Sequence, residues 1–358
     1  MKSFPRIQTT AVASLLAIPL LLSGCGIFGS QGAAQIDPPP ADVEAQMLQT
    51  TDQVNQTSSS GKTSTENTNQ ATVYLKNDQG LLAPVSLNLP QGSKEGKLNQ
   101  LMESLVQEGT YASSIPEGFQ GVLPKGTQVT NVSVDKKQKL AVVEFTKPFT
   151  NYDVKDERKI MEAITWTLTD NPDVQNVQLW VDGQKLNEMP VGHIPLNQPL
   201  NRTVGINLEL TPGANVSQTS PVTVYFSSST KSGVPYFVPV TRLVPAGEDS
   251  VKAALAQLIE GPVQGDGLQQ VLTSNTSVEQ VETAKDGVVT VSLKDDMFKP
   301  GEKVPAQLLQ SLVLTVTENT KSGKVRIWMN GNKNVVGDDN QKYSEPVSRP
   351  EALNHIPI

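Results

Sequence analysis

Residues 177–183 read VQLWVDG, and residues 325–331 read VRIWMNG. Both stretches place a tryptophan between aliphatic residues, and Trp180 and Trp328 are separated by 148 positions. Each stretch ends in Asp-Gly or Asn-Gly, which suit a type I′ turn because both central residues of that turn need a positive φ. Each therefore predicts a strand that ends in a tight turn, and the pair indicates that one fold occurs twice in the chain.

The repeat extends outward from these two strands. Residues 72–75 (TVYL) recur as residues 223–226 (TVYF), an offset of 151 positions. The offset changes by only three residues between this motif and the tryptophan motif. A period near 150 residues is far longer than the 20–50 residues of stacked repeats, so two complete domains are expected.

The apolar spacing predicts the same ββαββαβ order in both copies. Each copy has two starting strands, a short helix, two alternating strands, a longer helix and the tryptophan strand. The ranges expected in the first copy are 71–75, 84–89, 97–107, 129–134, 140–145, 160–168 and 177–181, and in the second 222–226, 236–244, 250–260, 278–281, 288–293, 308–316 and 325–329. The fold class expected is α+β, with a mixed sheet in each copy and two helices packed on one face of that sheet.

Local signals support several element ends. Gly261-Pro262 stops the helix at 250–260, and Pro305 suits the first turn of the following helix, where a missing N–H costs nothing. Asp286-Gly287 predicts a hairpin between the two strands that precede that helix.

The N-terminus predicts export. Lys2 and Arg6 precede a 12-residue apolar run at 11–22, which is shorter than the about 20 residues that a membrane-spanning helix needs. Residues 22–25 (LSGC) resemble the lipobox of bacterial lipoproteins. That resemblance implies that residues 1–24 are a lipoprotein signal peptide and that Cys25, the only cysteine, is lipidated. An ordinary signal peptide with an incidental cysteine is the alternative.

A polar tether is expected between Cys25 and the repeats. Of the 22 residues at 49–70, 17 are Ser, Thr, Asn or Gln, a composition that buries too little apolar surface to fold. The domain organisation expected is therefore a lipidated tether at 25–70, a first domain at 71–205, a linker at 206–220 around Thr211-Pro212-Gly213, and a second domain with a C-terminal tail at 221–358. Without the signal peptide the formal charge falls from −7 to −9, which argues against binding to nucleic acid.

The lipobox, the tether and the two copies together resemble the GerM family of sporulation and germination lipoproteins. The features that carry the resemblance are TVY[LF], a helix ending near Glu260-Gly261-Pro262, and the tryptophan strand. The resemblance implies a fold similar to ring-building domains of secretion systems and a location on the outer face of the cell membrane. It also implies protein partners in an envelope-spanning sporulation complex, and leaves homo-oligomeric or ring association open. The first copy departs from the pattern, because it lacks both Gly261-Pro262 and the residues at 239–242 (PVTR).

No residue constellation predicts catalysis, a cofactor or a metal site. His193 and His355 lie in matching contexts, GHIP and NHIP, without a nearby nucleophile or ligand set. Asp295-Asp296 and Asp338-Asp339 lack calcium-loop spacing, and Glu117 with Glu144 is a pair that any acidic chain offers. Trp180 and Trp328 are interpreted as core residues before sugar-stacking ones.

The expected function is therefore that of a non-enzymatic assembly lipoprotein in sporulation and later germination. The alternatives are a solute-binding lipoprotein of a transporter, or a cell-wall-associated protein that binds or cleaves peptidoglycan.

Overall fold

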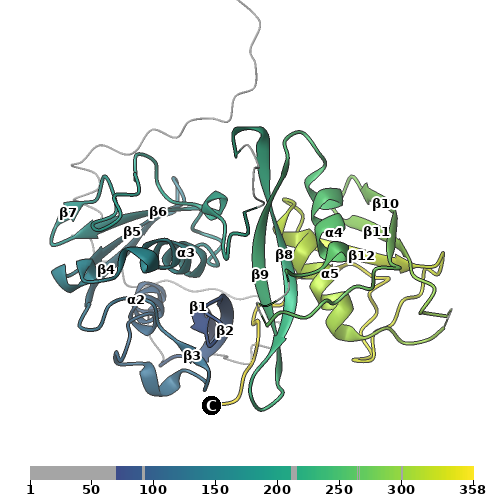
Figure 1. The fold of residues 1–358 in the computed structure, drawn as a ribbon, viewed down its shortest axis with the longest axis horizontal. Helices are drawn as coiled ribbons and strands as arrows, with labels where there is room; N and C mark the ends of the chain where they lie inside the picture. The colour runs from purple at the N-terminus through teal and green to yellow at the C-terminus, as the bar shows by residue number, and fades with distance from the viewer. Residues whose placement is uncertain (1–69, 91–92, 211–215, 264, 266, 300) are drawn as a thin grey trace, which may run out of the picture. The chain divides into compact units, whose positions relative to one another are not determined.

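The structure is a computed structural model that describes residues 70–90, 93–210, 216–263, 265, 267–299 and 301–358 (Figure 1). The expected signal peptide, Cys25 and nearly all of the expected tether lie outside these residues. Residues 211–215 of the expected linker also lie outside them.

Two copies of one α+β arrangement follow each other along the chain, in the order expected. The first consists of β1 (Gln70–Asn77), β2 (Leu82–Asn88), α2 (Lys94–Ser104), β3 (Phe119–Gln120), β4 (Val129–Asp135), β5 (Leu140–Phe145), α3 (Glu157–Leu168), β6 (Asn176–Val181) and β7 (Gln184–Lys185). The second consists of β8 (Thr219–Ser229), β9 (Pro235–Pro245), α4 (Ser250–Glu260), β10 (Ser277–Thr283), β11 (Val289–Lys294), α5 (Ala306–Glu318), β12 (Lys324–Met329) and β13 (Val347–Ser348). Short 3-10 helices connect them: η1 (Ala112–Ser114), η2 (Lys147–Thr150), η3 (Val154–Asp156), η4 (Arg202–Val204) and η5 (Val216–Gln218).

In each copy the strands divide between two sheets, where the sequence had suggested one. β1 and β2 form an antiparallel hairpin extended by β3, and β8 and β9 form the matching hairpin. The mixed sheets have the orders β4-β5-β6-β7 and β10-β11-β12-β13, with β5 parallel to β6 and β11 parallel to β12. The parallel pairs arise because a helix crosses over between their strands.

Both helices of a copy lie between its two sheets. In the first copy, α2 and α3 pack on one face of the mixed sheet, which confirms the expected arrangement, and α3 also carries β1 on its other side. A hydrogen bond from the Tyr74 N–H to the Thr167 hydroxyl ties the hairpin to α3. The Tyr225 N–H makes the same bond to the Thr315 hydroxyl on α5, so the copies match in side-chain detail.

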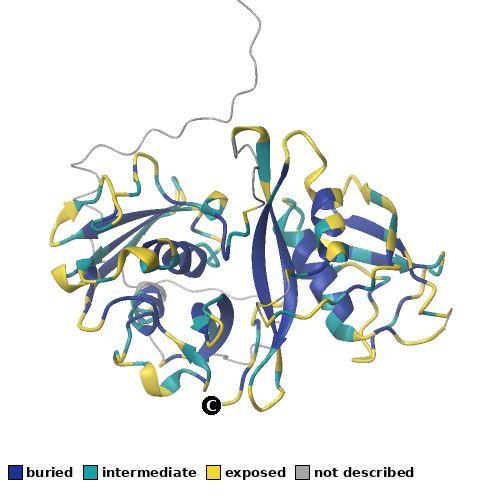
Figure 2. Ribbon diagram, in the orientation of Figure 1, coloured by how far each residue is buried: buried dark blue, intermediate teal, exposed yellow. Residues whose placement is uncertain are grey.

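The hairpin strands are buried on both faces. β2 is buried at six consecutive positions, and β9 at seven (Figure 2). One face of each hairpin meets the helices of its own copy, and β2 also packs against β9. A strand covered on both sides does not need strict polar–apolar alternation, which explains the weak alternation of these segments.

The turns after the tryptophan strands have the expected geometry. Asp182 and Gly183 have φ of 47° and 75°, and Asn330 and Gly331 have φ of 53° and 71°. Asp286-Gly287 likewise joins β10 and β11 in a hairpin, closed by a hydrogen bond from the Ala284 N–H to the Val288 carbonyl.

Within the described residues, no helix is both long enough and apolar enough to cross a lipid bilayer.

We expect Gly331→Ala to lower the free energy of unfolding by about 1–2 kcal/mol, because an L-residue at positive φ is strained. No neighbouring atom lies within 4 Å of a Cβ at position 331, so the substitution tests backbone strain alone. Gly323→Ala is the matched control, since position 323 is equally open and does not have a positive φ. Chemical denaturation measures both, and equal stability of the two variants would contradict the strain argument.

Candidate functional site

Two asparagines join the hairpins of the two copies by the same set of hydrogen bonds. Asn207 accepts from the Leu82 N–H at 2.8 Å, and its amide donates to the Leu82 and Pro239 carbonyls, both at 2.7 Å. Asn354, which lies 147 positions later, accepts from the Phe237 N–H at 2.8 Å. Its amide donates to the Phe237 carbonyl at 2.7 Å and to the Pro84 carbonyl at 2.6 Å. Both asparagines have a positive φ, of 47° and 54°.

These bonds relate the copies by a pseudo-two-fold axis. Pro84 pairs with Tyr74 in the first hairpin as Pro239 pairs with Tyr225 in the second, so the two prolines occupy equivalent positions. Each asparagine therefore makes two bonds to its own copy and one bond across, to the equivalent carbonyl of the other copy. A contact that is identical in both directions is the mark of an isologous interface, the type found in two-fold symmetric dimers.

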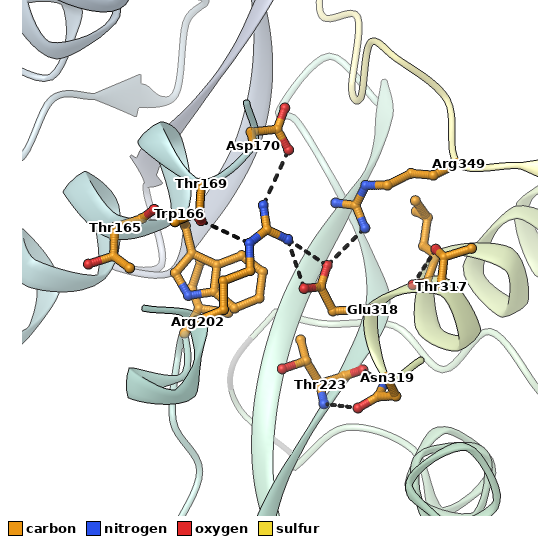
Figure 3. Close-up of polar contacts among 12 residues, drawn as sticks. Thr165, Trp166, Thr169, Asp170, Arg202, Thr223, Thr317, Glu318, Asn319 and Arg349 are labelled. Carbon is orange, nitrogen blue, oxygen red and sulfur yellow. Dashed lines mark hydrogen bonds and ion pairs between the residues drawn. The ribbon is translucent and has the colours of Figure 1, made fainter. Parts of the chain in front are cut away.

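A partly buried ionic cluster lies at the same interface (Figure 3). Glu318, the last residue of α5, accepts from Arg202 of the first copy through both carboxylate oxygens, at 2.7 and 2.8 Å. Arg349 donates to the same carboxylate at 2.9 Å and to the Tyr225 hydroxyl at 2.8 Å. One carboxylate of the second copy thus holds an arginine from each copy.

The arginine of the first copy is held from several directions. The Arg202 guanidinium lies 4.4 Å from the centroid of the Trp166 ring, donates to the Thr169 hydroxyl at 3.0 Å and approaches Asp170 at 3.4 Å. Trp166 and Thr169 belong to α3 and its C-terminus, so Arg202 connects the ends of α3 and α5. A planar cation with five donors suits such a site better than lysine does.

The members of the cluster are themselves repeated residues. Arg202 and Arg349 are 147 positions apart, Asp170 and Glu318 are 148 apart, and Tyr74 and Tyr225 are 151 apart. The symmetry is incomplete, because Glu318 binds both arginines whereas Asp170 makes only the longer contact to Arg202. The duplicated interface has therefore concentrated its ion pairing on one carboxylate.

Burial and charge oppose each other at Glu318. Its side chain is only 9% exposed, and burial alone would raise the pKa of the carboxyl group. The two adjacent guanidinium groups and the hydrogen bonds from Arg202 and Tyr225 outweigh burial, so the pKa of Glu318 is lowered. Burial raises the pKa of Tyr74 to about 12, so this phenol stays neutral beside the arginines. Near neutral pH Glu318 therefore stays charged and Tyr74 stays neutral.

The sequence-predicted candidates do not come together. The His193 Nδ1 lies 2.8 Å from a Glu188 carboxylate oxygen, and the His355 Nδ1 lies 3.4 Å from the Gln70 amide nitrogen. Asp295 accepts from Thr273 and Thr276, Asp338 accepts from the first N–H of α5, and Glu144 accepts from the Gly183 N–H. These carboxylates organise turns and helix ends. Among the described residues, no three His, Cys, Asp or Glu side chains are grouped so that they could hold a metal ion.

The two repeated tryptophans differ in environment. Trp180 is buried on the side of its sheet away from the helices, whereas Trp328 is half-buried with the Lys333 ammonium 4.4 Å from its ring centroid. Neither lies in the helix-facing core of its copy.

Arg242 shows why PVTR at 239–242 and Gly261-Pro262 occur together in the second copy and are both missing from the first. It donates to the Gln257 and Gly261 carbonyls at 3.1 and 2.8 Å, and so satisfies the end of α4, where the chain turns at Gly261-Pro262. It also pairs with Glu209 at 2.7 Å. Leu87 is the equivalent residue of the first copy, because it pairs with Ala71 as Arg242 pairs with Val222. The first copy therefore lacks both the arginine and the Gly-Pro helix end, whereas the second copy has both.

Sequence reasoning missed the interface cluster. The available signal was the recurrence of Arg202, Asp170 and Asn207 at the repeat offset, in segments that lack an apolar pattern. An isolated charged residue in a loop is normally solvated, so only the folded arrangement shows that these residues are paired and buried.

The fold and this interface define a class of protein: a tandem of two homologous α+β units held in a two-fold relation by their hairpins. The sequence matches the Germane family, described as "Sporulation and spore germination", over residues 72–187 and 223–335. It is 35% identical to the spore germination protein GerM of Bacillus subtilis (strain 168), over 96% of both chains. The solved tandem GerMN domains of GerM from Bacillus subtilis are 35% identical, cover 80% of this chain and 98% of that chain, and superpose with a TM-score of 0.73.

The chain therefore belongs to the Germane family of sporulation and spore germination proteins, and its two-domain fold is that of tandem GerMN domains. The predicted family resemblance and fold class are confirmed. A role in sporulation and germination follows from this membership.

We expect Glu318→Gln to lower the free energy of unfolding by about 2–3 kcal/mol, because it leaves two partly buried guanidinium groups, 26% and 21% exposed, without their main counter-charge. Glu345→Gln is the matched control. Its carboxylate is 70% exposed and lies 3.7 Å from Lys342, so its loss should change stability by about 1 kcal/mol or less. Urea denaturation at pH 7 measures both, and equal losses would show that the Glu318 cluster is not a buried ion network.

We also expect the stabilisation from Glu318 to be lost on acidification. The pKa of Glu318 is lowered in the folded state, so its contribution is fully present above the unfolded value near 4.5 and disappears as pH falls through the folded value. Thermal unfolding between pH 7 and pH 3 should therefore show a smaller acid-induced loss in Glu318→Gln than in the parent chain. Parallel pH profiles for the two proteins would contradict the lowered pKa.

Proposed function

We propose that this protein is a lipid-anchored, non-enzymatic scaffold on the outer face of the cell membrane, which supports assembly of an envelope-spanning protein complex during sporulation and later affects germination. The observation that carries the proposal is the two-fold bonding of Asn207 and Asn354. It gives a rigid unit in which two homologous domains have one fixed relative orientation.

Two equivalent surfaces held in one orientation suit a scaffold. When one partner copy binds, the second surface is already oriented for another, and the weak individual contacts add through effective concentration. A flexible pair of domains would lose part of this gain to the entropy of ordering. The buried Glu318 cluster and the two asparagine bridges supply that order.

The surfaces left for partners are those that the interface does not use. The hairpins are buried where the two copies meet, and the helices are covered by sheets on both sides. The outer faces and edges of the mixed sheets remain. β10 is the edge strand of the second mixed sheet, and Glu279 and Glu282 on it are exposed. Charged edge residues discourage uncontrolled strand addition and leave charge-selective contacts available.

The lipid anchor and the tether set how far the paired domains can lie from the membrane. Lipidation of Cys25 would provide the stable membrane attachment that a diacyl group gives. A polar tether of about 45 residues has a root-mean-square reach of roughly 35–40 Å, which places the paired domains clear of the lipid headgroups.

Nothing in the described residues favours the solute-binding alternative. A two-lobed binding protein closes on a ligand between its lobes, whereas here the asparagine bridges and the ionic cluster bond the two copies directly to each other. The pocket beside that cluster is lined by Trp166, Arg202 and Glu318, and its guanidinium and carboxylate groups already pair with each other over the Trp166 ring.

We expect Cys25→Ala, expressed in place of the native gene in the spore-forming bacterium, to move the protein from the membrane to the soluble fraction and to cause a sporulation or germination defect. The anchor is a covalent lipid on that sulfur, so the substitution removes attachment without touching the folded domains. Ser30→Ala, five positions downstream, is the matched control and should behave as wild type. Membrane fractionation, spore counts and germination rates are the measurements.

Two results would overturn the proposal. If the Cys25→Ala protein stays in the membrane, a lipid on Cys25 is not its anchor. If a deletion strain forms wild-type spores, the protein is not a scaffold needed for sporulation. Co-purification from sporulating cells then identifies the partners, and hydrolysis of peptidoglycan by the purified protein would establish an enzyme instead.

A further inference from the structure

The outer face of the second mixed sheet is basic. Side chains alternate along a strand, and the buried residues Leu293, Val325 and Ile327 face the helices. The residues that alternate with them face the opposite side, and among these are Lys294 on β11 and Lys324, Arg326 and Trp328 on β12. Lys333 follows the turn after β12 and places its ammonium 4.4 Å from the centroid of the Trp328 ring. We use the term basic face for the set Lys294, Lys324, Arg326, Trp328 and Lys333.

The four cations of the basic face are accessible and unpaired. The three lysines are exposed, and Arg326 is half-buried. Among the described residues, no carboxylate forms an ion pair with any of the four. Their charge is therefore available to a partner outside the domain.

Few carboxylates offset these charges. On the edge strand β10 the register places Glu282 opposite Thr290, on this face, and Glu279 stands at a β-bulge. Thr290 is 7% exposed, because its short side chain is flanked in register by the longer side chains of Glu282 and Arg326. The face therefore has a net positive charge, although the whole chain has a formal charge of −7.

The first copy shows that the fold does not require these cations. At the repeat offset of 148 positions, three of the four are replaced by neutral residues. The replacements are Thr146 for Lys294, Asn176 for Lys324 and Gln178 for Arg326. In addition, Glu144 takes the place of Ser292 on that face. The positive charge is thus a property of the second copy and not of the shared architecture.

The composition of the basic face fits a lipid surface better than a protein partner. Three of its four cations are lysines, and lysine is depleted in protein–protein interfaces because its ammonium is strongly hydrated. Beside a bilayer a lysine keeps its water and is still attracted by anionic headgroups. A tryptophan among such cations suits the headgroup level, where aromatic rings with one polar edge are enriched. A four-stranded sheet is about 15 Å across, so it can meet several headgroups at once.

We propose that the basic face binds the headgroup surface of a bilayer that contains anionic phospholipid. The lysines and Arg326 lie against headgroup phosphates, and Trp328 lies at the same level. Other faces of this acidic chain are repelled by the same surface, so the contact also sets the orientation of the paired domains. The contact needs no lipid on Cys25. Where that anchor is present, the flexible tether lets the domains turn this face to the lipid, and the high local concentration strengthens a weak contact.

The test measures co-sedimentation with lipid vesicles. Residues 25–358 with Cys25→Ala keep every residue that the structure describes and omit the apolar run at 11–22, which would bind any bilayer. We expect at least ten times tighter binding to phosphatidylcholine vesicles with about 30% phosphatidylglycerol than to phosphatidylcholine alone, at about 50 mM salt. Binding should be lost at about 500 mM salt, where charges are screened within a few ångström. Equal binding to both vesicles would overturn the proposal.

The first copy supplies the substitutions that locate the contact. A triple variant with Lys294→Thr, Lys324→Asn and Arg326→Gln should bind the anionic vesicles at least ten times more weakly, because each cation near the surface contributes. The matched control removes three exposed lysines from α4 and from the loops beside the N-terminus of α5, and should bind within a factor of two of the parent. Its substitutions are Lys252→Gln, Lys303→Gln and Lys342→Gln. Equal losses in the two variants would show that only total charge matters and would overturn the proposal.

A gain of binding excludes misfolding as the cause. Glu282→Gln removes the carboxylate that the register places on the basic face, so it should at least double the affinity for anionic vesicles. Glu345→Gln, which removes an exposed carboxylate in a loop after α5, is the matched control and should leave the affinity nearly unchanged. No difference between these two variants would contradict the proposed contact.

Soluble polyglutamate tests an acidic protein segment as the occupant. If the triple variant loses affinity for polyglutamate while its vesicle binding equals that of the parent, the partner is an acidic polypeptide and the bilayer is excluded. These chains carry no lipid, so the outcome does not depend on whether Cys25 is an anchor or on whether the protein is a scaffold.

Discussion

The relation between the two copies depends on hydrogen bonds and charges that are taken out of water together. Asn207 and Asn354 satisfy backbone groups of both hairpins, and Glu318 neutralises an arginine from each copy. Buried ion pairs often contribute little net stability, because their desolvation offsets their attraction. They nevertheless penalise other arrangements strongly, since any shift leaves a charge or a polar group without a partner. The cluster therefore selects one orientation of the copies more than it adds to their stability.

Because the interface is isologous, it can arise from the pairing of two identical domains. A domain that presents a hairpin with one available carbonyl and an asparagine in reach can pair with a second copy of itself. Joining the two copies in one chain raises their effective concentration and makes that pairing permanent. Once the copies are covalently linked, each can change separately. The ionic cluster has become centred on Glu318, and Arg242 with Gly261-Pro262 closes the helix of the second copy only.

The outer faces of the two mixed sheets also differ between the copies. The first mixed sheet has an apolar outer face around Trp180, and the second has a polar one around Trp328. The duplicated fold therefore supplies two outer faces of unequal polarity.

The sequence alone determined the repeat, the order of the elements, the turn types and the family. These properties are local or periodic: Asp182-Gly183 and Asn330-Gly331 specify their turns through backbone conformation, and the apolar spacing specifies α5 through one helical face. The division of each copy into a hairpin and a mixed sheet was not visible, because a strand buried on both faces does not show which sheet it joins.

Only the tertiary structure decided the interface and the unequal outer faces. Arg202, Glu318 and Arg349 stand in three distant segments, and each resembles a solvated surface charge when its own segment is read alone. Trp180 and Trp328 occupy equivalent positions, yet their environments differ, and the neighbouring strand carries Val142 in one sheet and Thr290 in the other. The energy of such groups depends on neighbours brought from far along the chain, so it is fixed by the fold and not by local sequence.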